Sequence, residues 1–571
     1  MTLDNNRNMI LAIVLSALVL FGWSFASERW FPTANPPATQ VVDGKQVPVA
    51  NPETGSPLPN TPAILRDRAA VLGESARIAI DTPELKGSIN LKGARIDDLT
   101  LTAYNETIAK NSPPVRLLSP AGAKHSYFAG FGWAGQGAAL PNADTVWTPS
   151  ASTLTPAAPV TLSWDNGQGL RFEIEVAVDK DYMFTVKQKV SNTGQGAVAT
   201  QAYGYVSRDG VSADPDSWTI HTGPIGVFNA KANYSINFKD VDEAGNNGVQ
   251  NASKGGWLGF TDKYWLTALV PDQNANMTGT FRVGTDKNYQ ADFTNEAAIV
   301  APGKAVTTTS RFFAGAKEVG VLNKHQEAGV PLFSYSIDWG WFWFFEKPFF
   351  GLLDWLFKLF NNFGVAIICL TLIIRVLMFP IAQKQFKSMA GMRVIQPKMK
   401  ALQERYKDDK QKLQQEMLAL YQKEKINPLA GCLPILLQIP IFYALYKVLM
   451  LTIEMRHQPF VLWIKDLSAP DPLTPVNLFG LLDFTPPSFL ALGVLPILLG
   501  ISMYLQFKLN PAPADPIQQQ VFGIMPWVFM FIMAPFAAGL QLYWLTNNIL
   551  SIAQQKWLYS RHPAMQEAAS K

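Results

Sequence analysis

The sequence predicts a polytopic α-helical membrane protein that carries a large β-sandwich domain outside the bilayer. Two contrasting halves of the 571 residues lead to this fold class. Residues 64–337 are polar and contain many short runs of alternating hydrophobicity, which is the pattern of half-buried strands. From residue 340 onward, long runs of Phe, Leu, Ile, Met and Trp predominate. The length also exceeds what one hydrophobic core can hold, so several domains are expected.

The first apolar run, residues 9–25 (MILAIVLSALVLFGWSF), is long enough to span a bilayer. Residues 24–26 also form an acceptable cleavage site, so a retained anchor and a cleaved signal peptide both fit the run. Residues 32–63 are Pro-rich and hold few large apolar side chains. A segment of that composition cannot build a core, and we expect an extended tether.

The clearest strand pattern is LRFEIEVAVD at residues 170–179. Its alternation continues after Lys180 and Asp181, which predicts a β-hairpin. Many similar runs separated by Gly, Pro and Asn indicate a β-sandwich on the outer side of the membrane. The apolar positions of this hairpin are Phe172, Ile174, Val176, Val178, Tyr182, Phe184, Val186 and Val190.

Sandwich folds also host sugar-binding sites, so a membrane-anchored carbohydrate-binding protein is the alternative function. Such a site needs convergent carboxylates or histidines in a cleft. The candidates Glu173, Glu175 and Asp179 fall on the solvated face of their strand by the same alternation. A solute transporter is a second alternative, but the internal repeat typical of many transporters is missing from the sequence.

The aromatic segment 338–360 (DWGWFWFFEKPFFGLLDWLFKLF) is interrupted by four charges. A helix lying at the membrane interface and a buried core helix both fit it, and its aromatic content favours the interface. Five further apolar segments follow it. With the first run they give six expected transmembrane helices.

Loop charges set the predicted orientation. Residues 384–429 carry eleven Lys and Arg against five Asp and Glu, whereas residues 454–487 hold two basic residues. Positive loops stay in the cytoplasm. Both termini are therefore predicted to be cytoplasmic and the β domain external.

The predicted segments follow from these patterns. They are an N-terminal transmembrane anchor (1–28), a Pro-rich linker (29–63), the β domain (64–337), the interfacial helix (338–360), five further spans (361–383, 430–453, 488–508, 517–534 and 535–556), a cytoplasmic helical hairpin (384–429), an outer loop (454–487), a cytoplasmic loop (509–516) and a cytoplasmic tail (557–571).

One permanent charge, Arg375, lies inside the second span, a few residues past its midpoint. Such a charge costs a few kcal/mol, and it either snorkels to the cytoplasmic face or serves a function. Polar residues of other spans fall in the same inner half. Each alone fits an interhelical contact, but together with the charge they predict a hydrated cavity open to the cytoplasm. They are Gln438, Ser502, Gln506, Tyr543, Asn547 and Ser551, and Thr371 lies one turn before Arg375 on the same face of its own span.

Lys447 does not fit this cavity, because it lies in the outer half of its span. It is near enough to the end to snorkel, and Glu454 just beyond it is a possible partner. The sequence holds no nucleotide-binding loop and no metal-ligand spacing among its two cysteines and five histidines. We therefore expect no catalytic residue, no cofactor, no metal and no nucleic-acid partner.

Several stretches, in order along nearly the whole chain, resemble the YidC membrane protein insertases of Gram-negative bacteria. Because they run in order over nearly the whole chain, the match is far more specific than a short motif. The matching stretches are SKGGW (253–257), DWGWFWF (338–344), the Arg375 span, MRVIQPKMKALQER (392–405), NPLAGCLPILLQIPIFYALY (427–446) and LYWLTNNILSIAQQ (542–555).

The resemblance implies a membrane protein insertase and chaperone of the bacterial inner membrane, with six transmembrane helices, five of them forming the core. It implies that the first span is retained and that the β domain is a periplasmic supersandwich. Arg375 then lies in a substrate groove, with Thr371 facing the substrate one turn earlier. Tyr543 and Trp544 match the paired aromatics of the last span, and Trp stands where Tyr also occurs in relatives.

The partners implied by the resemblance are nascent membrane proteins, the Sec translocon, the lipid bilayer and, through the cytoplasmic hairpin, the ribosome and the signal-recognition-particle receptor. Insertion occurs alone or beside the translocon. The tail has only Lys556, Arg561 and Lys571 as basic residues, which argues against a strong ribosome tether. Met-rich faces of the hairpin fit both packing of its two arms and transient contact with apolar clients.

Overall fold

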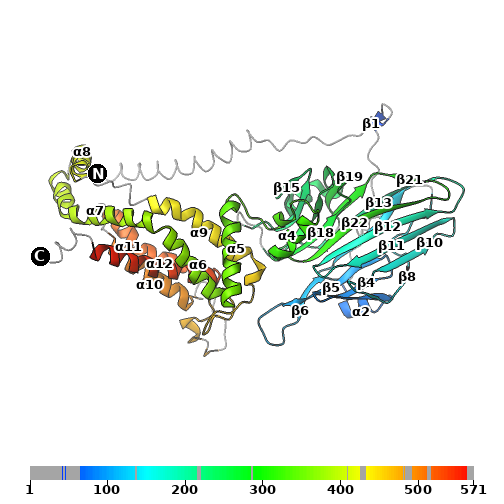
Figure 1. Ribbon diagram of the computed structural model, residues 1–571, viewed down its shortest axis with the longest axis horizontal. Helices are drawn as coiled ribbons and strands as arrows, with labels where there is room; N and C mark the ends of the chain where they lie inside the picture. Colours follow the sequence, from blue (N-terminus) through cyan, green and yellow to red (C-terminus); the bar gives the residue numbers. More distant parts are fainter. Residues whose placement is uncertain are drawn as a thin grey trace.

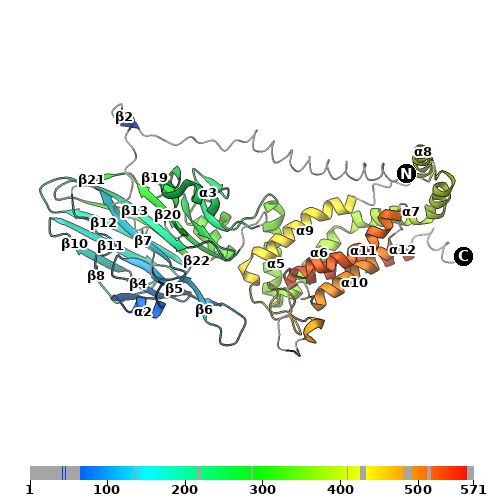
Figure 2. The same cartoon turned by 180° about the vertical axis from the view of Figure 1, so that it is seen from behind.

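A β domain and a helical region lie side by side along the longest axis of the molecule (Figures 1 and 2). The computed structural model describes residues 41–42, 45–46, 65–135, 138–214, 220–284, 287–407, 409–424, 433–479, 481–482, 492–510 and 516–561. The expected first span, most of the linker and most of the C-terminal tail lie outside these residues.

Within the described residues, nine strands form one sheet of the β domain. Every pairing in this sheet is antiparallel. The order across it is β15 (Lys231–Asn233), β14 (Gly223–Phe228), β17 (Trp257–Thr261), β18 (Trp265–Val270), β22 (Ala305–Ala316), β12 (Met183–Asn192), β11 (Leu170–Val178), β10 (Val160–Asp165) and β8 (Thr148–Pro149).

The second sheet has eleven described strands. Its one parallel pair joins the third and ninth strands of the chain at the sheet edge. The order is β16 (Val249–Lys254), β19 (Asn276–Val283), β20 (Asn288–Asn295), β13 (Val198–Asp209), β7 (Tyr127–Gly135), β5 (Arg95–Asn105), β4 (Leu85–Asn90), β3 (Arg77–Asp81) and β9 (Thr153–Leu154), with β21 (Ala298–Val300) paired to β13 and β6 (Pro114–Leu118) to β5. β1 (Val41–Val42) and β2 (Lys45–Gln46) pair separately.

The two sheets pack through aromatic side chains. Trp133 of β7 meets Phe172 of β11 with ring centroids 5.1 Å apart, and Gln188 of β12 donates to the carbonyl of Gly132 at 2.7 Å. The predicted hairpin is confirmed, since β11 and β12 pair antiparallel from Leu170 to Val178, and its apolar positions are at most 4% exposed. The fold class is therefore a β-sandwich joined to a helical region.

Short helices connect the strands and lead out of the domain. α3 begins with a capping box, in which Asn237 accepts from the amide of Asp240 and Asp240 accepts from the amide of Asn237. The short helices are α2 (Arg68–Leu72), α3 (Phe238–Ala244), η2 (Gly245–Asn247), α4 (Val319–Glu327) and η4 (Phe333–Ser336).

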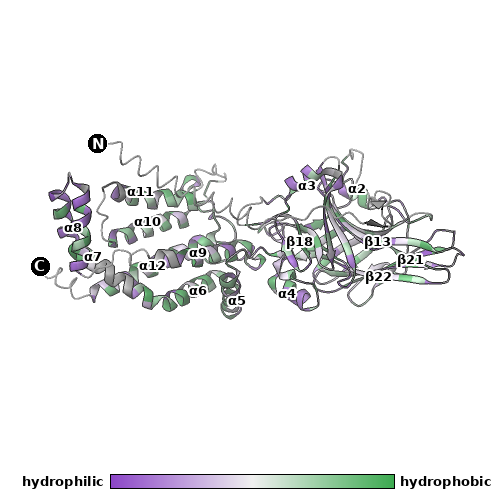
Figure 3. Cartoon of the chain, turned by 90° about the horizontal axis from the view of Figure 1, so that it is seen from above, coloured by the Kyte–Doolittle hydropathy of each residue, from purple (hydrophilic) through white to green (hydrophobic). Residues whose placement is uncertain are grey.

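The helical region follows from residue 343 onward. α5 lies crosswise to the other helices at the end next to the β domain (Figures 1 and 3). Its elements are α5 (Trp343–Phe360), α6 (Phe363–Leu377), α7 (Phe379–Arg405), α8 (Lys410–Lys423), α9 (Leu433–Leu451), η6 (Ile453–Met455), η7 (Pro475–Asn477), α10 (Val494–Leu509), α11 (Pro516–Met533) and α12 (Ala538–Ser560).

In the part of the chain that the structure describes, none of the helices combines the length and the apolar character needed to cross a membrane. The prediction of six spans stays a prediction.

The helix around Arg375 is shorter than the sequence predicts. Asn362 caps its start by accepting from the amide of Val365 at 3.1 Å. It ends at Leu377 rather than near residue 383. The reason is Pro380, which lies in the first turn of α7 and has no amide N–H to continue the helix before it.

Lys447 connects α9 to the end of the β domain through a hydrogen bond and an ion pair. Its ammonium is 2.7 Å from the carbonyl of Asp338 and 3.2 Å from the carboxylate of the same residue. The proposed pairing with Glu454 was wrong, because the chain after the β domain runs directly against α9. Gly340, with φ of 64°, permits this approach, since a Cβ there would lie 2.8 Å from the Lys447 nitrogen.

Two further side chains beyond α9 complete this joint. Glu454 accepts from the amide of Val319 at 3.0 Å, at the start of α4. Arg456 donates to the carbonyls of Asn105 and Glu106 at 2.8 and 3.2 Å and stacks over Trp265. The joint therefore holds three separate parts of the β domain.

Glu346 lies beside the same joint, in the first turn of α5. It is 0% exposed, and neither carboxylate oxygen has a hydrogen-bond partner among the described residues. Burial raises the pKa of Glu346 to about 8; Asp338 raises it further, and Lys447 opposes the shift. The side chain is thus held as a neutral carboxylic acid near pH 7.

Because the folded-state pKa exceeds the unfolded value near 4.5, the unfolded chain loses this proton first. The contribution of Glu346 to the free energy of unfolding is then fully present below about pH 4.5 and is lost as the pH rises to about 8. We predict that Glu346→Gln removes this loss of stability. The free energy of unfolding of the variant should exceed that of the native chain by at most about 5 kcal/mol at pH 8.5, and the two should be equal at pH 4.5. Thermal unfolding in detergent across this range measures it.

The control is Glu327→Gln, at an exposed position on α4. It should leave the pH profile of the native chain unchanged. Parallel profiles for the native chain and Glu346→Gln would contradict the assignment.

Candidate functional site

Arg375 links α6 to α12 through its guanidinium. Nε donates to Asn547 Oδ1 at 2.9 Å and one terminal nitrogen to the Asn547 carbonyl at 3.2 Å. The same nitrogen donates to the hydroxyl of Ser551. Among the described residues no carboxylate forms an ion pair with Arg375, so these neutral groups bind the charge without neutralising it.

A hollow of about 320 Å³ lies beside this guanidinium, between α6 and α12. Its walls are mainly apolar, and Gln554 adds a buried amide nitrogen without a partner in the described structure. The hollow therefore offers apolar contact together with one charge and one polar group. The lining residues are Leu372, Arg375, Val376, Phe379, Leu550, Ala553, Gln554 and Trp557.

Gln438 and Tyr543 form a second polar contact, closer to the N-terminal end of α12. The Gln438 amide donates to the Tyr543 hydroxyl at 3.0 Å, which joins α9 to α12. Tyr543 is 2% exposed. Next to it, Trp544 lies between the rings of Phe442 and Phe529, at 4.3 and 4.4 Å. The paired aromatics thus contact two further helices, α9 and α11.

Ser502 and Asn548 form a third contact, on another side of α12. The Asn548 amide donates to the Ser502 hydroxyl at 3.0 Å, and that hydroxyl donates to the Leu499 carbonyl. Both side chains are buried. Ser502 therefore joins α10 to α12 and lies apart from the Arg375 cluster. Gln506, one turn farther along α10, is half-buried.

Thr371 is not open to the hollow. It is 1% exposed, and its hydroxyl donates to the carbonyl of Ile367 at 2.7 Å within its own helix. The residues on the same helix that reach the hollow are Leu372 and Val376. A substrate-facing role thus fits these neighbours better than Thr371 itself.

Of the predicted site residues, Arg375, Asn547 and Ser551 come together in one cluster, and Gln438 and Tyr543 in a second. The sequence places Gln554 on the same helical face as Tyr543, Asn547 and Ser551, yet the predicted groove residues did not include it, although it lines the hollow. They also did not include Asn548, which binds Ser502.

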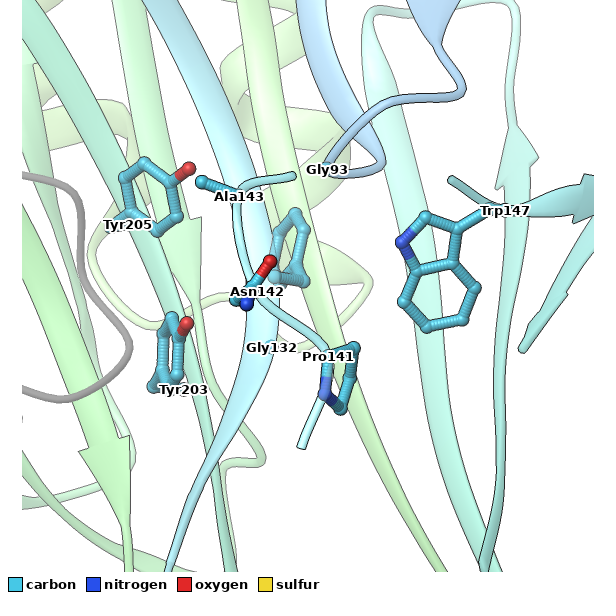
Figure 4. A pocket seen from close by; sticks show the side chains of 9 residues that line it. Gly93, Gly132, Pro141, Asn142, Ala143, Trp147, Tyr203 and Tyr205 are labelled. Atoms are coloured by element: carbon cyan, nitrogen blue, oxygen red, sulfur yellow. The ribbon is translucent and has the colours of Figure 1, made fainter. Parts of the chain in front are cut away.

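The β domain provides no sugar site at the candidate carboxylates. Glu173 pairs with Lys189 and Glu175 with Lys187, each at 2.8 Å, as cross-strand ion pairs on the outer face. Figure 4 shows a cavity between strands, lined by Trp147, Tyr203, Tyr205 and neighbouring residues. Its volume of about 20 Å³ suits a single water rather than a sugar ring.

Comparison with known proteins places both parts of the chain in one group. Residues 77–352 match the family described as the YidC periplasmic domain, and residues 355–566 match the 60Kd inner membrane protein family. The chain is 51% identical over 563 residues to a membrane protein insertase YidC of Zymomonas mobilis, covering 98% of this chain and 96% of the relative.

Other relatives agree with this. A membrane protein insertase YidC of Methylorubrum extorquens is 47% identical over 591 residues, covering 98% of this chain and 96% of the relative. A crystal structure of active YidC insertase with the first transmembrane domain resolved covers 84% of this chain and 92% of its own, at 19% identity and a TM-score of 0.36. The sequence matches carry the assignment.

We predict that Ser502 and Asn548 act as a structural pair. In a double-mutant cycle, Ser502→Ala and Asn548→Ala should show a coupling energy of about 0.6 kcal/mol, the average for such bonds in membrane proteins. Unfolding in detergent by sodium dodecyl sulfate titration measures it. Gln506→Ala combined with Asn548→Ala is the control and should be additive within about 0.3–0.5 kcal/mol. Additivity in both cycles would contradict the pairing.

Proposed function

The chain belongs to the YidC family of membrane protein insertases, and on that premise we propose that a client segment meets it at Arg375 and the adjoining hollow. The observation that carries this proposal is an arginine that, within the described structure, is bound only to neutral groups at the edge of an apolar hollow. Any carboxylate or carbonyl group of a client entering there gains a charge-assisted hydrogen bond.

The hollow suits both chemical parts of a client. Leu372, Val376 and Trp557 are at least 45% exposed and offer contact to an apolar segment. Arg375 and Gln554 offer hydrogen bonds to the polar tail that precedes or follows it. The polar tail then has a shorter apolar distance to cross, because Arg375 already provides a polar group in the inner half of the bilayer.

The driving force comes from the client and the membrane. Partition of a Leu-rich span of about twenty residues supplies on the order of 10 kcal/mol. The membrane potential adds about 2.3 kcal/mol per charge per 100 mV. These terms suffice for a short tail without nucleotide hydrolysis.

The proposed topology has six spans, with both termini in the cytoplasm and the β domain in the periplasm. It is supported by the basic character of residues 384–429. α7 and α8 form the proposed cytoplasmic hairpin, where Lys398 pairs with Glu424 at 2.7 Å and Leu418 is 57% exposed. This hairpin is the proposed contact for the ribosome and the signal-recognition-particle receptor, and the Sec translocon is a further proposed partner.

We predict that positive charge at residue 375 matters more than guanidinium geometry. Arg375→Ala should lower the rate of insertion of a short single-spanning client about tenfold or more, since hydrogen bonds to a charged group contribute about 1.5–3 kcal/mol. Arg375→Lys should keep most of the rate, because an ammonium still binds carboxylates and carbonyls. Protease protection of the client in proteoliposomes measures insertion. Lys556→Ala, at an exposed position on α12, is the control, and equal losses for Lys and Ala at residue 375 would refute the prediction.

Photocrosslinking during client synthesis tests the location. A photoreactive residue at Leu550 or Leu372, which line the hollow, should crosslink to the client as its apolar segment emerges and lose the crosslink once insertion is complete. Ile549, 53% exposed on another face of α12, is the matched control and should react with lipid. Thr371 should crosslink weakly because it is buried. Equal client crosslinks at Leu550 and Ile549 would place the client path elsewhere.

A further inference from the structure

The loop between α9 and α10 carries apolar side chains outward and polar ones inward. Asp471 and Thr474 are 4% and 3% exposed, whereas Leu462 and Leu481 are 83% and 84% exposed. A loop of a water-soluble surface shows the reverse arrangement. The exposed apolar set is Val461, Leu462, Val476, Leu478, Phe479, Leu481 and Leu482.

Asp471 organises the inner side of this loop. Its carboxylate accepts from the Trp463 indole at 2.9 Å, from the Leu473 amide at 3.0 Å and from the Leu495 amide at 2.7 Å. The last bond caps the start of α10. Between Leu467 and Leu482 it is the only charged residue in the sequence, so the outward edge of that segment carries no charge.

The backbone amides in the last part of the outward edge are also paired within the loop. The amides of Leu478, Phe479, Leu481 and Leu482 donate to carbonyls within residues 474–478, at 2.8–3.3 Å. The Asn477 amide donates to the Thr474 hydroxyl. A segment with paired amides can leave water at low cost, whereas unpaired amides would hold it in an aqueous phase.

The loop continues an apolar surface of the helical region. Asn362, between α5 and α6, donates to the Phe460 carbonyl at 3.2 Å, and the Phe460 ring fills the space where Gly364 lacks a side chain. The outward edge therefore begins beside the end of α5, where Leu359 and Phe360 are 60% and 45% exposed. The loop lies at the end of the helices that faces the β domain (Figure 1).

We propose that residues 461–482 insert their apolar edge among the acyl chains of the outer leaflet and so anchor the outer ends of α9 and α10 at a fixed depth. A protein partner would be expected to meet a polar rim around an apolar centre, whereas the exposed side chains described along this edge are apolar apart from Lys465. The proposal rests on the membrane-spanning placement of α9 and α10 in the proposed topology.

Nitroxide accessibility in proteoliposomes tests the insertion. Single cysteines replace Leu462 and Leu481 in the full chain after Cys369 and Cys432 are changed to Ser, and each carries a nitroxide label. Power saturation compares relaxation by oxygen, which partitions into lipid, with relaxation by a water-soluble nickel chelate. Two reference positions are labelled in the same way. Ile501→Cys, on the exposed apolar face of α10, gives the ratio expected for a label in lipid. Thr107→Cys, exposed on the β domain, gives the ratio expected for a label in water.

The proposal expects oxygen-to-nickel ratios at Leu462→Cys and Leu481→Cys several-fold above that at Thr107→Cys and close to that at Ile501→Cys. Ratios equal to that at Thr107→Cys, with Ile501→Cys still in lipid, would overturn the loop insertion and leave the topology standing. A nickel-accessible Ile501→Cys would overturn both. An immobile label that neither reagent reaches would show a protein cover and would also overturn the proposal.

Discussion

The helical region depends on the polar side chains of α12, because each of its faces binds a different neighbour. Asn547 and Ser551 bind Arg375 of α6, Tyr543 binds Gln438 of α9, and Asn548 binds Ser502 of α10. Apolar packing between helices in a bilayer gains little from hydrophobicity, since lipid is equally apolar. Specific hydrogen bonds therefore set the arrangement, and the hollow beside Arg375 exists because α6 and α12 are held by this polar contact.

Residue pattern predicted the β-sandwich and its central hairpin, since alternation alone places Phe172 and Ile174 on the buried face. It did not predict the strand order, because the pairing of β7 with β13 or of β12 with β22 joins residues far apart in sequence. The polar residues of α12 were identified, yet their division among three neighbours depends on helix rotation and crossing. Lys447 shows the same limit, since Asp338 is distant in sequence.

The joint at the end of α9 gives the β domain a defined position against the helices. Lys447, Glu454 and Arg456 bind three separate segments of the domain, around Asp338, Val319 and Asn105. A flexible tether would need none of these contacts. The domain therefore covers the end of the helical region at which α9 ends.

The buried charges of the helical region differ in how they are compensated, and this difference supports the proposed role of Arg375. Lys447 has a carboxylate partner, Asp471 caps a helix, and Glu346 stays neutral because nothing binds its oxygens. Each is accounted for by structure alone. Arg375 keeps its charge among neutral groups beside an open hollow, and a structural residue would not need that charge, since an amide side chain can also make interhelical hydrogen bonds. An uncompensated charge beside an accessible cavity suits a transient binding partner, and in the proposed function that partner is the client.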